Sequence, residues 1–152
     1  MARAQTAKYE ELVLEVEWTP ASGTYVSVCG LTDVTINRTS QIDTTEVPDC
    51  DDESLPLAIE RQVRSQEVIV SATGVWANQS HANMHDWWYA GTTLNARIRN
   101  AYVEANGTTG DPSIETGPAI LATLNNARTK GQKVTADVEI QFDGVPTVTD
   151  VV

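Results

Sequence analysis

The sequence predicts a mainly β fold, a β-sandwich or a partly open barrel with one short α-helix packed on it. Residues 134–142 alternate strictly between apolar and polar side chains, which is the period of a strand with one buried face. Residues 10–18 alternate in the same way with a single break. Residues 80–90 instead repeat apolar side chains at helical spacing. Two segments with the periodicity of a strand and one with the periodicity of a helix therefore define the expected fold class.

The remaining elements follow in chain order. Residues 1–8 carry no periodicity and are expected to form a flexible arm. Further strands are expected at residues 25–28, 32–47, 61–76, 93–103 and 119–127, which makes about seven strands in all. The whole chain, residues 1–152, is long enough for one domain with a sizeable core, and residues 144–152 are expected to be a C-terminal arm.

The expected helix has signals at both ends. Asn78 or Ser80 can cap its first turn, and Gly91 suits the residue that follows its last turn. Trp87 and Trp88 are adjacent on it and point about 100° apart, so they cannot form one flat sugar-binding platform. One tryptophan is expected to pack on the sheet, and the other to meet a sheet edge or a neighbouring subunit.

Residues 40–60 are expected to form an extended acidic loop. Its centre, residues 48–56, combines two prolines with four carboxylates, which is typical of a solvated loop. The alternative is the tip of a long excursion that another subunit covers, because apolar residues lie among the charges. The residues expected to make that contact are Ile42, Val47, Asp49, Asp51, Asp52, Glu53, Leu55, Leu57 and Ile59.

Composition excludes several classes of protein. The 152 residues include 21 acidic and 10 basic side chains, for a net charge of −11. This charge disfavours a nucleic-acid-binding protein, whose affinity comes from Lys and Arg at phosphates. There is no apolar signal segment near the N-terminus and no run long enough to span a membrane, so we expect synthesis in the cytoplasm.

No constellation for catalysis or metal binding stands out. His81 and His85 have the i, i+4 spacing of metal ligands, but no third ligand is evident, and both are expected on the helix surface. The acidic run at residues 49–53 lacks the spacing of a calcium loop. Cys29 is expected to pack as a small hydrophobe, and Cys50 lies in the acidic loop. No enzyme activity, cofactor or metal is therefore expected.

Several short motifs occur in a distinctive order. They are Cys29-Gly30-Leu31, the acidic cluster 49–52, the strand end 72–76, the Trp-Trp helix closed by Gly91, and residues 117–121 leading into an alternating strand that ends at Asp143-Gly144. Their order and spacing, over roughly residues 25–148, resemble the major tail (tail tube) proteins of long, flexible-tailed bacteriophages and their tail-like relatives.

The resemblance implies a structural virion protein. Six subunits would form a ring whose strands pool into an inner β-barrel, and rings would stack into a hollow tube. The excursion at residues 40–60 would reach an adjacent ring or subunit. The implied partners are further copies of the chain, the tail initiator, tape-measure and terminator proteins, and DNA that passes without specific binding. The implied location is the tail of the virion.

A DNA channel favours an acidic wall, because carboxylates repel phosphates and let DNA slide. The candidates for this wall are Asp33, Glu67, Asp137, Glu139 and Asp143. The alternative is that these carboxylates lie on the outer wall and keep the tube soluble.

Two other functions stay open at this point. One is a monomeric β-sandwich module that binds a carbohydrate or a cell-surface partner. The other is a tail-terminator or head–tail joining protein. Concentration-dependent assembly distinguishes a tube protein from a binding module, which stays monomeric. Filament length distinguishes a tube protein from a terminator or joining protein, which stops at one ring.

Overall fold

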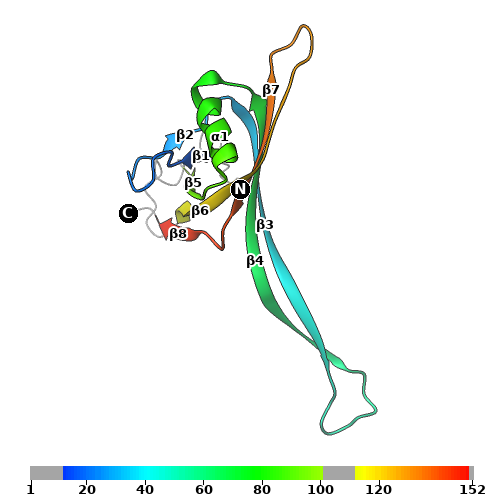
Figure 1. The fold of residues 1–152 in the computed structure, drawn as a ribbon. Coiled ribbons are helices and arrows are strands. Elements are labelled where there is room, and N and C mark those ends of the chain that lie inside the picture. Colours follow the sequence, from blue (N-terminus) through cyan, green and yellow to red (C-terminus); the bar gives the residue numbers. More distant parts are fainter. Residues whose placement is uncertain (1–11, 101–111, 151–152) are drawn as a thin grey trace, which may run out of the picture.

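One antiparallel sheet organises the chain (Figure 1). The computed structural model describes residues 12–100 and 112–150. Its elements are β1 (Leu12–Val16), β2 (Val26–Ser27), β3 (Leu31–Val47), β4 (Ala58–Val75), α1 (Asn78–Ala90), β5 (Leu94–Asn100), β6 (Pro112–Ala127), β7 (Thr135–Phe142) and β8 (Thr147–Asp150). Within this described part the strands run in the order β2-β1-β5-β6-β7-β4-β3, with β8 also paired to β6. The mainly β class with one short helix is confirmed, and the sheet is open rather than closed.

The core lies on one face of this sheet, under α1. Strand β7 alternates as predicted, with Ala136, Val138, Ile140 and Phe142 buried. Val138, Ile140 and Phe142 join buried residues from β1, β4, β5 and β6 and from the helix in one apolar cluster. The helix covers the cluster with two buried side chains, Met84 and Trp87. This cover is needed because one face of a sheet cannot exclude water by itself.

The helix begins in a different way from the one predicted. Its N-cap residue is Ala77, and neither Asn78 nor Ser80 caps the first turn. The hydroxyl of Ser80 accepts the N–H of Cys29 at 2.8 Å instead, which ties the helix to the loop before β3. The C-terminal prediction is confirmed, since Gly91 has left-handed backbone angles (φ 63°) and its N–H donates to a carbonyl of the last turn.

Strand β1 departs from the predicted pattern of one buried and one solvated face. Glu15 is 5% exposed, and its carboxylate lies 3.2 Å from Nε of Arg97 and 3.0 Å from Nε of Arg99. Tyr25 covers Arg97, with the guanidinium 4.4 Å from the ring centroid. Burial raises the pKa of Tyr25, the Glu17 carboxylate raises it further, and Arg97 opposes both effects. The second face of β1 is therefore a small buried ionic cluster.

Strands β3 and β4 extend far beyond the rest of the sheet. They pair from Leu31 opposite Gly74 to Val47 opposite Ala58. Pairing of β4 with β7 begins only at Ile69, so residues 38–68, here called the arm, project as a two-stranded ribbon (Figure 1). At roughly 3.3 Å per residue, residues 58–68 span about 35 Å.

This ribbon corrects the loop predicted over residues 40–60. Only residues 48–57 connect the strands, because the β-branched residues on both sides of them pair in a ladder that has one register shift, between Gln41 and Ile42. The predicted C-terminal arm is also partly sheet, since β8 pairs with β6 through Thr147 and Thr116. The predicted N-terminal arm, residues 1–8, lies outside the described residues.

Candidate assembly surfaces

The sheet face opposite the core collects the carboxylates predicted to line a channel. Directly opposed residues of an antiparallel pair point to the same face. Asp33 opposes Thr73, and Thr73 opposes Asp137, so these side chains share a face across β3, β4 and β7. Glu139 opposes Ser71 on that same face, because both lie two residues further along their strands.

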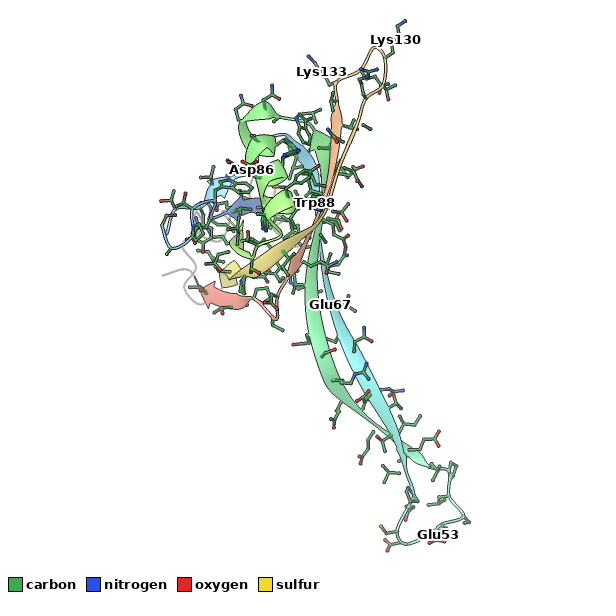
Figure 2. The ribbon with its side chains drawn as sticks, viewed as in Figure 1. Glu53, Glu67, Asp86, Trp88, Lys130 and Lys133 are labelled. Carbon is green, nitrogen blue, oxygen red and sulfur yellow. The ribbon has the colours of Figure 1, made fainter. Side chains whose placement is uncertain are left out.

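Two further carboxylates complete this set, here called the acidic face. Glu67 lies on the same side of β4, where the arm leaves the body (Figure 2). Asp143 directly follows β7, and its N–H donates to the carbonyl of Pro118 at 2.8 Å. The side chain of Glu139 accepts a bond from the hydroxyl of Thr123 at 3.4 Å. The structure therefore brings the five predicted residues to one surface.

Basic side chains do not neutralise the acidic face. Across residues 33–39, 67–73 and 135–141 the sequence holds one arginine and no lysine. That arginine, Arg38, opposes Val68 and so points to the other side, where its guanidinium binds both oxygens of Glu115 at 2.7 and 2.8 Å. The face therefore presents uncompensated negative charge to whatever lies in front of it.

The arm has an apolar side that its own chain leaves in water. Ile42 opposes Val63, and Ile59 lies on the same side further out, opposite Glu46. The side chains of Leu55 and Leu57 follow in the connection, and these five apolar residues are between 48% and 53% exposed. These apolar side chains lie along one side of a narrow ribbon, and the described part of the chain does not bury them. Val47, also predicted for this contact, ends β3 and is partly buried.

The end of the arm, here called the acidic tip (residues 48–57), is held by its own side chains. Oδ1 of Asp49 accepts the N–H groups of Asp51 and Asp52 at 2.8 and 3.1 Å. Oδ1 of Asp52 accepts the N–H of Ser54 at 3.0 Å and its hydroxyl at 2.5 Å. The hydroxyl bond, and then the backbone bond, lower the pKa of Asp52. These bonds shape the tip, and the fully exposed carboxylates keep its charge.

The other end of the same sheet carries the opposite charge. The connection between β6 and β7, here called the basic turn (residues 128–134), contains Arg128, Lys130 and Lys133 (Figure 2). Gly131 supplies the positive φ of 84° that the turn needs. This surface was not predicted from the sequence. The signal was present, since three of the ten basic residues of an acidic chain fall within six positions.

Among the other candidate side chains, His81 and Cys29 lie elsewhere than predicted, whereas His85 and Cys50 are exposed as predicted. His81 is fully buried, and its ring stacks on Trp76 with centroids 4.2 Å apart, whereas His85 stays exposed beside Tyr89. Cys29 is exposed rather than buried, and Cys50 is exposed at the acidic tip. Residues 12–100 and 112–150 bring together no group of three His, Cys, Asp or Glu side chains that could hold a metal ion. In these same ranges no helix has the length and apolarity needed to cross a membrane.

A hollow of about 310 Å³ opens beside the exposed side of α1. Its lining residues are Trp18, Pro20, Asn83, Asp86, Trp87, Ala90, Thr92 and Leu94. Trp18 and Trp87 meet edge to face in its wall, with centroids 5.9 Å apart. Asp86 is the single ionisable side chain of this lining, so the lining does not place a nucleophile beside a general base.

These surfaces define a class of protein. An open sheet with an unpartnered amphipathic arm, and with opposite charges at its two ends, is a subunit suited to association with other copies. The sequence model of the phage tail tube protein family matches residues 6–148. The chain therefore belongs to the phage tail tube protein family, and it is a structural component of the tail of a phage or phage-like particle.

Solved structures agree on the fold. The chain is similar to the tail subunit of an empty gene transfer agent (GTA) particle refined with C6 symmetry, with a TM-score of 0.70 and 14% identity over 96% of this chain and 99% of that one. The chain is also similar to a subunit of the native GTA virion, with a TM-score of 0.67 and 14% identity over 96% of this chain and 99% of that one. Its TM-score to the SPP1 tail tube subunit is 0.66, with 9% identity over 95% of this chain and 80% of that one. No curated protein matches the chain.

Proposed function

We propose that this protein assembles into hexameric rings that stack into a hollow tube, and that DNA passes through the tube without specific binding. The observation that carries the proposal is a pair of open edges. The segment β6-β7-β4-β3 ends on one side at β3, which has no further neighbour among the described strands. On the other side, pairing of β6 with β5 stops at Ala119, so residues 120–127 are paired only with β7.

Joining these two edges between subunits would close a ring. A long exposed edge strand is a liability that closure removes, and a contact between two different edges continues around a ring. Four strands from each subunit would then form one pooled barrel. The C6 symmetry of a GTA tail with a similar fold supports six subunits for that barrel.

The same closure assigns the two faces of the sheet. The core and α1 cover one face, so they would lie outside the barrel, and the acidic face would line the channel. Asp33, Glu67, Asp137, Glu139 and Asp143 would then repel the phosphates of DNA in transit. The apolar side of the arm would lie against an adjacent ring or subunit, together with the acidic tip.

Electron microscopy of the purified protein tests the proposal. We expect hollow tubes or rings in negative stain, either after concentration or with a tail initiator present, and light scattering that rises with protein concentration. A species that stays monomeric under all these conditions would indicate a binding module instead. Single rings that never stack would indicate a terminator or joining protein. Membership of a family of structural proteins supports a role without catalysis.

A further inference from the structure

We propose that the acidic tip of one subunit docks on the basic turn of a second copy in the adjacent ring. This inference rests on the proposed tube. The inference adds to the proposed tube the two surfaces that meet and the charges that align them. These charges are Asp49, Asp51, Asp52 and Glu53 on one copy, and Arg128, Lys130 and Lys133 on the other.

The two surfaces are complementary in charge over long stretches. Residues 47–60 contain five carboxylates and no basic residue. Residues 116–136 contain three basic residues and no carboxylate. Every residue of the acidic tip is exposed, and so is each residue from 128 to 133. A tip meeting another tip would place like charges together, so the basic turn is the partner that charge selects.

Among the residues that the structure describes, no ion pair neutralises either surface. Within residues 12–100 and 112–150, the ion pairs join Arg38 to Glu115, Arg64 to Asp43, and both Arg97 and Arg99 to Glu15. None of them involves the acidic tip or the basic turn. A subunit with a net charge of −11 repels its copies, so a local attraction of this kind must align them before apolar contact forms.

The direction of the arm fits this docking. Strand β4 joins the two ends of the molecule, because its first residue leaves the acidic tip and its last residue, Val75, opposes Thr135 just after the basic turn (Figure 2). A shift of one copy along the strands therefore brings its tip towards the turn of the next. Such a head-to-tail contact uses different surfaces on the two copies and repeats without limit, as a stack of rings requires.

The apolar side of the arm gives the contact its affinity. Ile59, Leu55 and Leu57 lie beside the carboxylates and are about half exposed. Docking would remove their surfaces from water, at roughly 25 cal/mol per Å² of apolar area. Surface ion pairs are worth less, but they set orientation and suppress wrong partners. The charged side chains therefore determine how the two copies align, and the apolar side chains supply most of the binding free energy.

Charge reversal on both surfaces tests the docking. One variant carries Asp51→Lys and Glu53→Lys, because the hydrogen bonds that shape the tip are accepted by Asp49 and Asp52 instead. A second variant carries Lys130→Glu and Lys133→Glu, and a third combines all four changes. We expect each pair of changes to raise the protein concentration needed for tubes by at least about tenfold, equivalent to 1.4 kcal/mol, and the combination to restore most of the loss.

The controls separate this inference from the proposed function. Asp86→Lys reverses one carboxylate on α1, away from both ends, which is half the change of charge in the first variant, and it should leave assembly near the wild-type level. All samples are compared at one ionic strength, because salt screens the docking charges and the general repulsion together. If the wild-type protein forms no rings or tubes, the proposed function fails. If it forms tubes and the variants assemble equally well, or the combination recovers nothing, the docking is wrong and the tube stands.

A covalent probe gives an independent readout. Cys50 lies in the acidic tip, and Gln132→Cys places a second thiol in the basic turn, in a background with Cys29→Ser. Two cysteines bridge only when their Cα atoms come within about 7 Å. Mild oxidation of tubes should give a ladder of covalent multimers well beyond dimers, since each subunit then links to one above and one below. No ladder, or dimers alone in assembled tubes, would overturn the docking.

Discussion

The carbonyl group of Gly30 lies against the Cα atom of Gly74, with no room for a side chain between them. The N–H of Val75 donates to the same carbonyl oxygen at 2.9 Å. Gly30 has a φ of +88°, and a Cβ there would lie 2.6 Å from the carbonyl oxygen of Val75. Two glycines from separate motifs of the sequence therefore hold the start of β3 against the end of β4, just before the helix.

We predict that Gly74→Ala destabilises the fold by about 3 kcal/mol or more, because the new methyl group would push the two strands apart. Ser71→Ala, on the same strand, should change the free energy of unfolding by less than about 1 kcal/mol. Urea unfolding of both variants gives the comparison. Equal unfolding midpoints for the two would show that the strands can move apart at little cost.

The buried carboxylate of Glu15 should also be important for stability. Glu15→Ala removes the buried carboxylate that Arg97 and Arg99 share and leaves two partly exposed cations side by side, so we expect a loss of about 1–3 kcal/mol. Arg38→Ala breaks an ion pair whose arginine is 54% exposed, and should cost less than about 1 kcal/mol. Thermal unfolding of the two variants measures this difference. A smaller loss for Glu15→Ala than for Arg38→Ala would contradict the buried cluster.

The two histidines of α1 should differ sharply. Nδ1 of His81 accepts the N–H of Ala77 at 2.8 Å, which satisfies a free donor at the start of the helix. His81→Ala removes this bond together with the stack on Trp76, and should cost about 2–4 kcal/mol. His85→Ala, on the exposed side, should cost less than about 0.5 kcal/mol. Denaturant titration followed by tryptophan fluorescence reports both, and similar losses would refute the burial of His81.

The acidic tip should respond to pH through Asp52. Its folded pKa is lowered, so the stabilisation of the turn is present above the ordinary aspartate pKa and is lost as pH falls through the lower folded value. Ser54→Ala removes the hydroxyl bond that contributes most, and should move the Asp52 pKa up towards its ordinary value. NMR titration of the carboxyl carbon measures this shift. An unchanged Asp52 pKa in the variant would exclude the hydroxyl as its cause.

The acidic face should affect DNA transit if it lines the channel. Particles carrying Asp137→Lys and Glu139→Lys should still assemble, but DNA should bind the new cations and leave more slowly, above all at low ionic strength. Asp86→Lys on α1 is the control and should leave ejection unchanged. Ejection kinetics at two salt concentrations give the readout. Normal delivery by the double variant at low salt would place these residues on the outer wall.

Local patterns allowed much of the fold to be predicted. Strand β7 was predicted because alternate side chains point to opposite faces in any strand, whatever packs on them. The end of α1 at Gly91 was predicted because left-handed backbone angles favour glycine in any helix. Alternation also placed Asp137 and Glu139 on one face of β7, whereas only the pairing of β3 and β7 with β4 brings Asp33 and Glu67 to that face.

Burial and pairing were decided only by the tertiary structure. His81 and His85 have the same local signal, and the position of Trp76 alone makes one of them part of the core. Alternation along β1 predicted a solvated Glu15, whereas in the folded chain its buried carboxylate lies against Arg97 and Arg99. By itself the sequence determined the strand periods, the helix, the glycine turns and the net charge, because these depend on neighbours along the chain. The projecting arm and the separation of acidic tip from basic turn depend on which strands pair, and pairing is a choice between segments far apart in sequence.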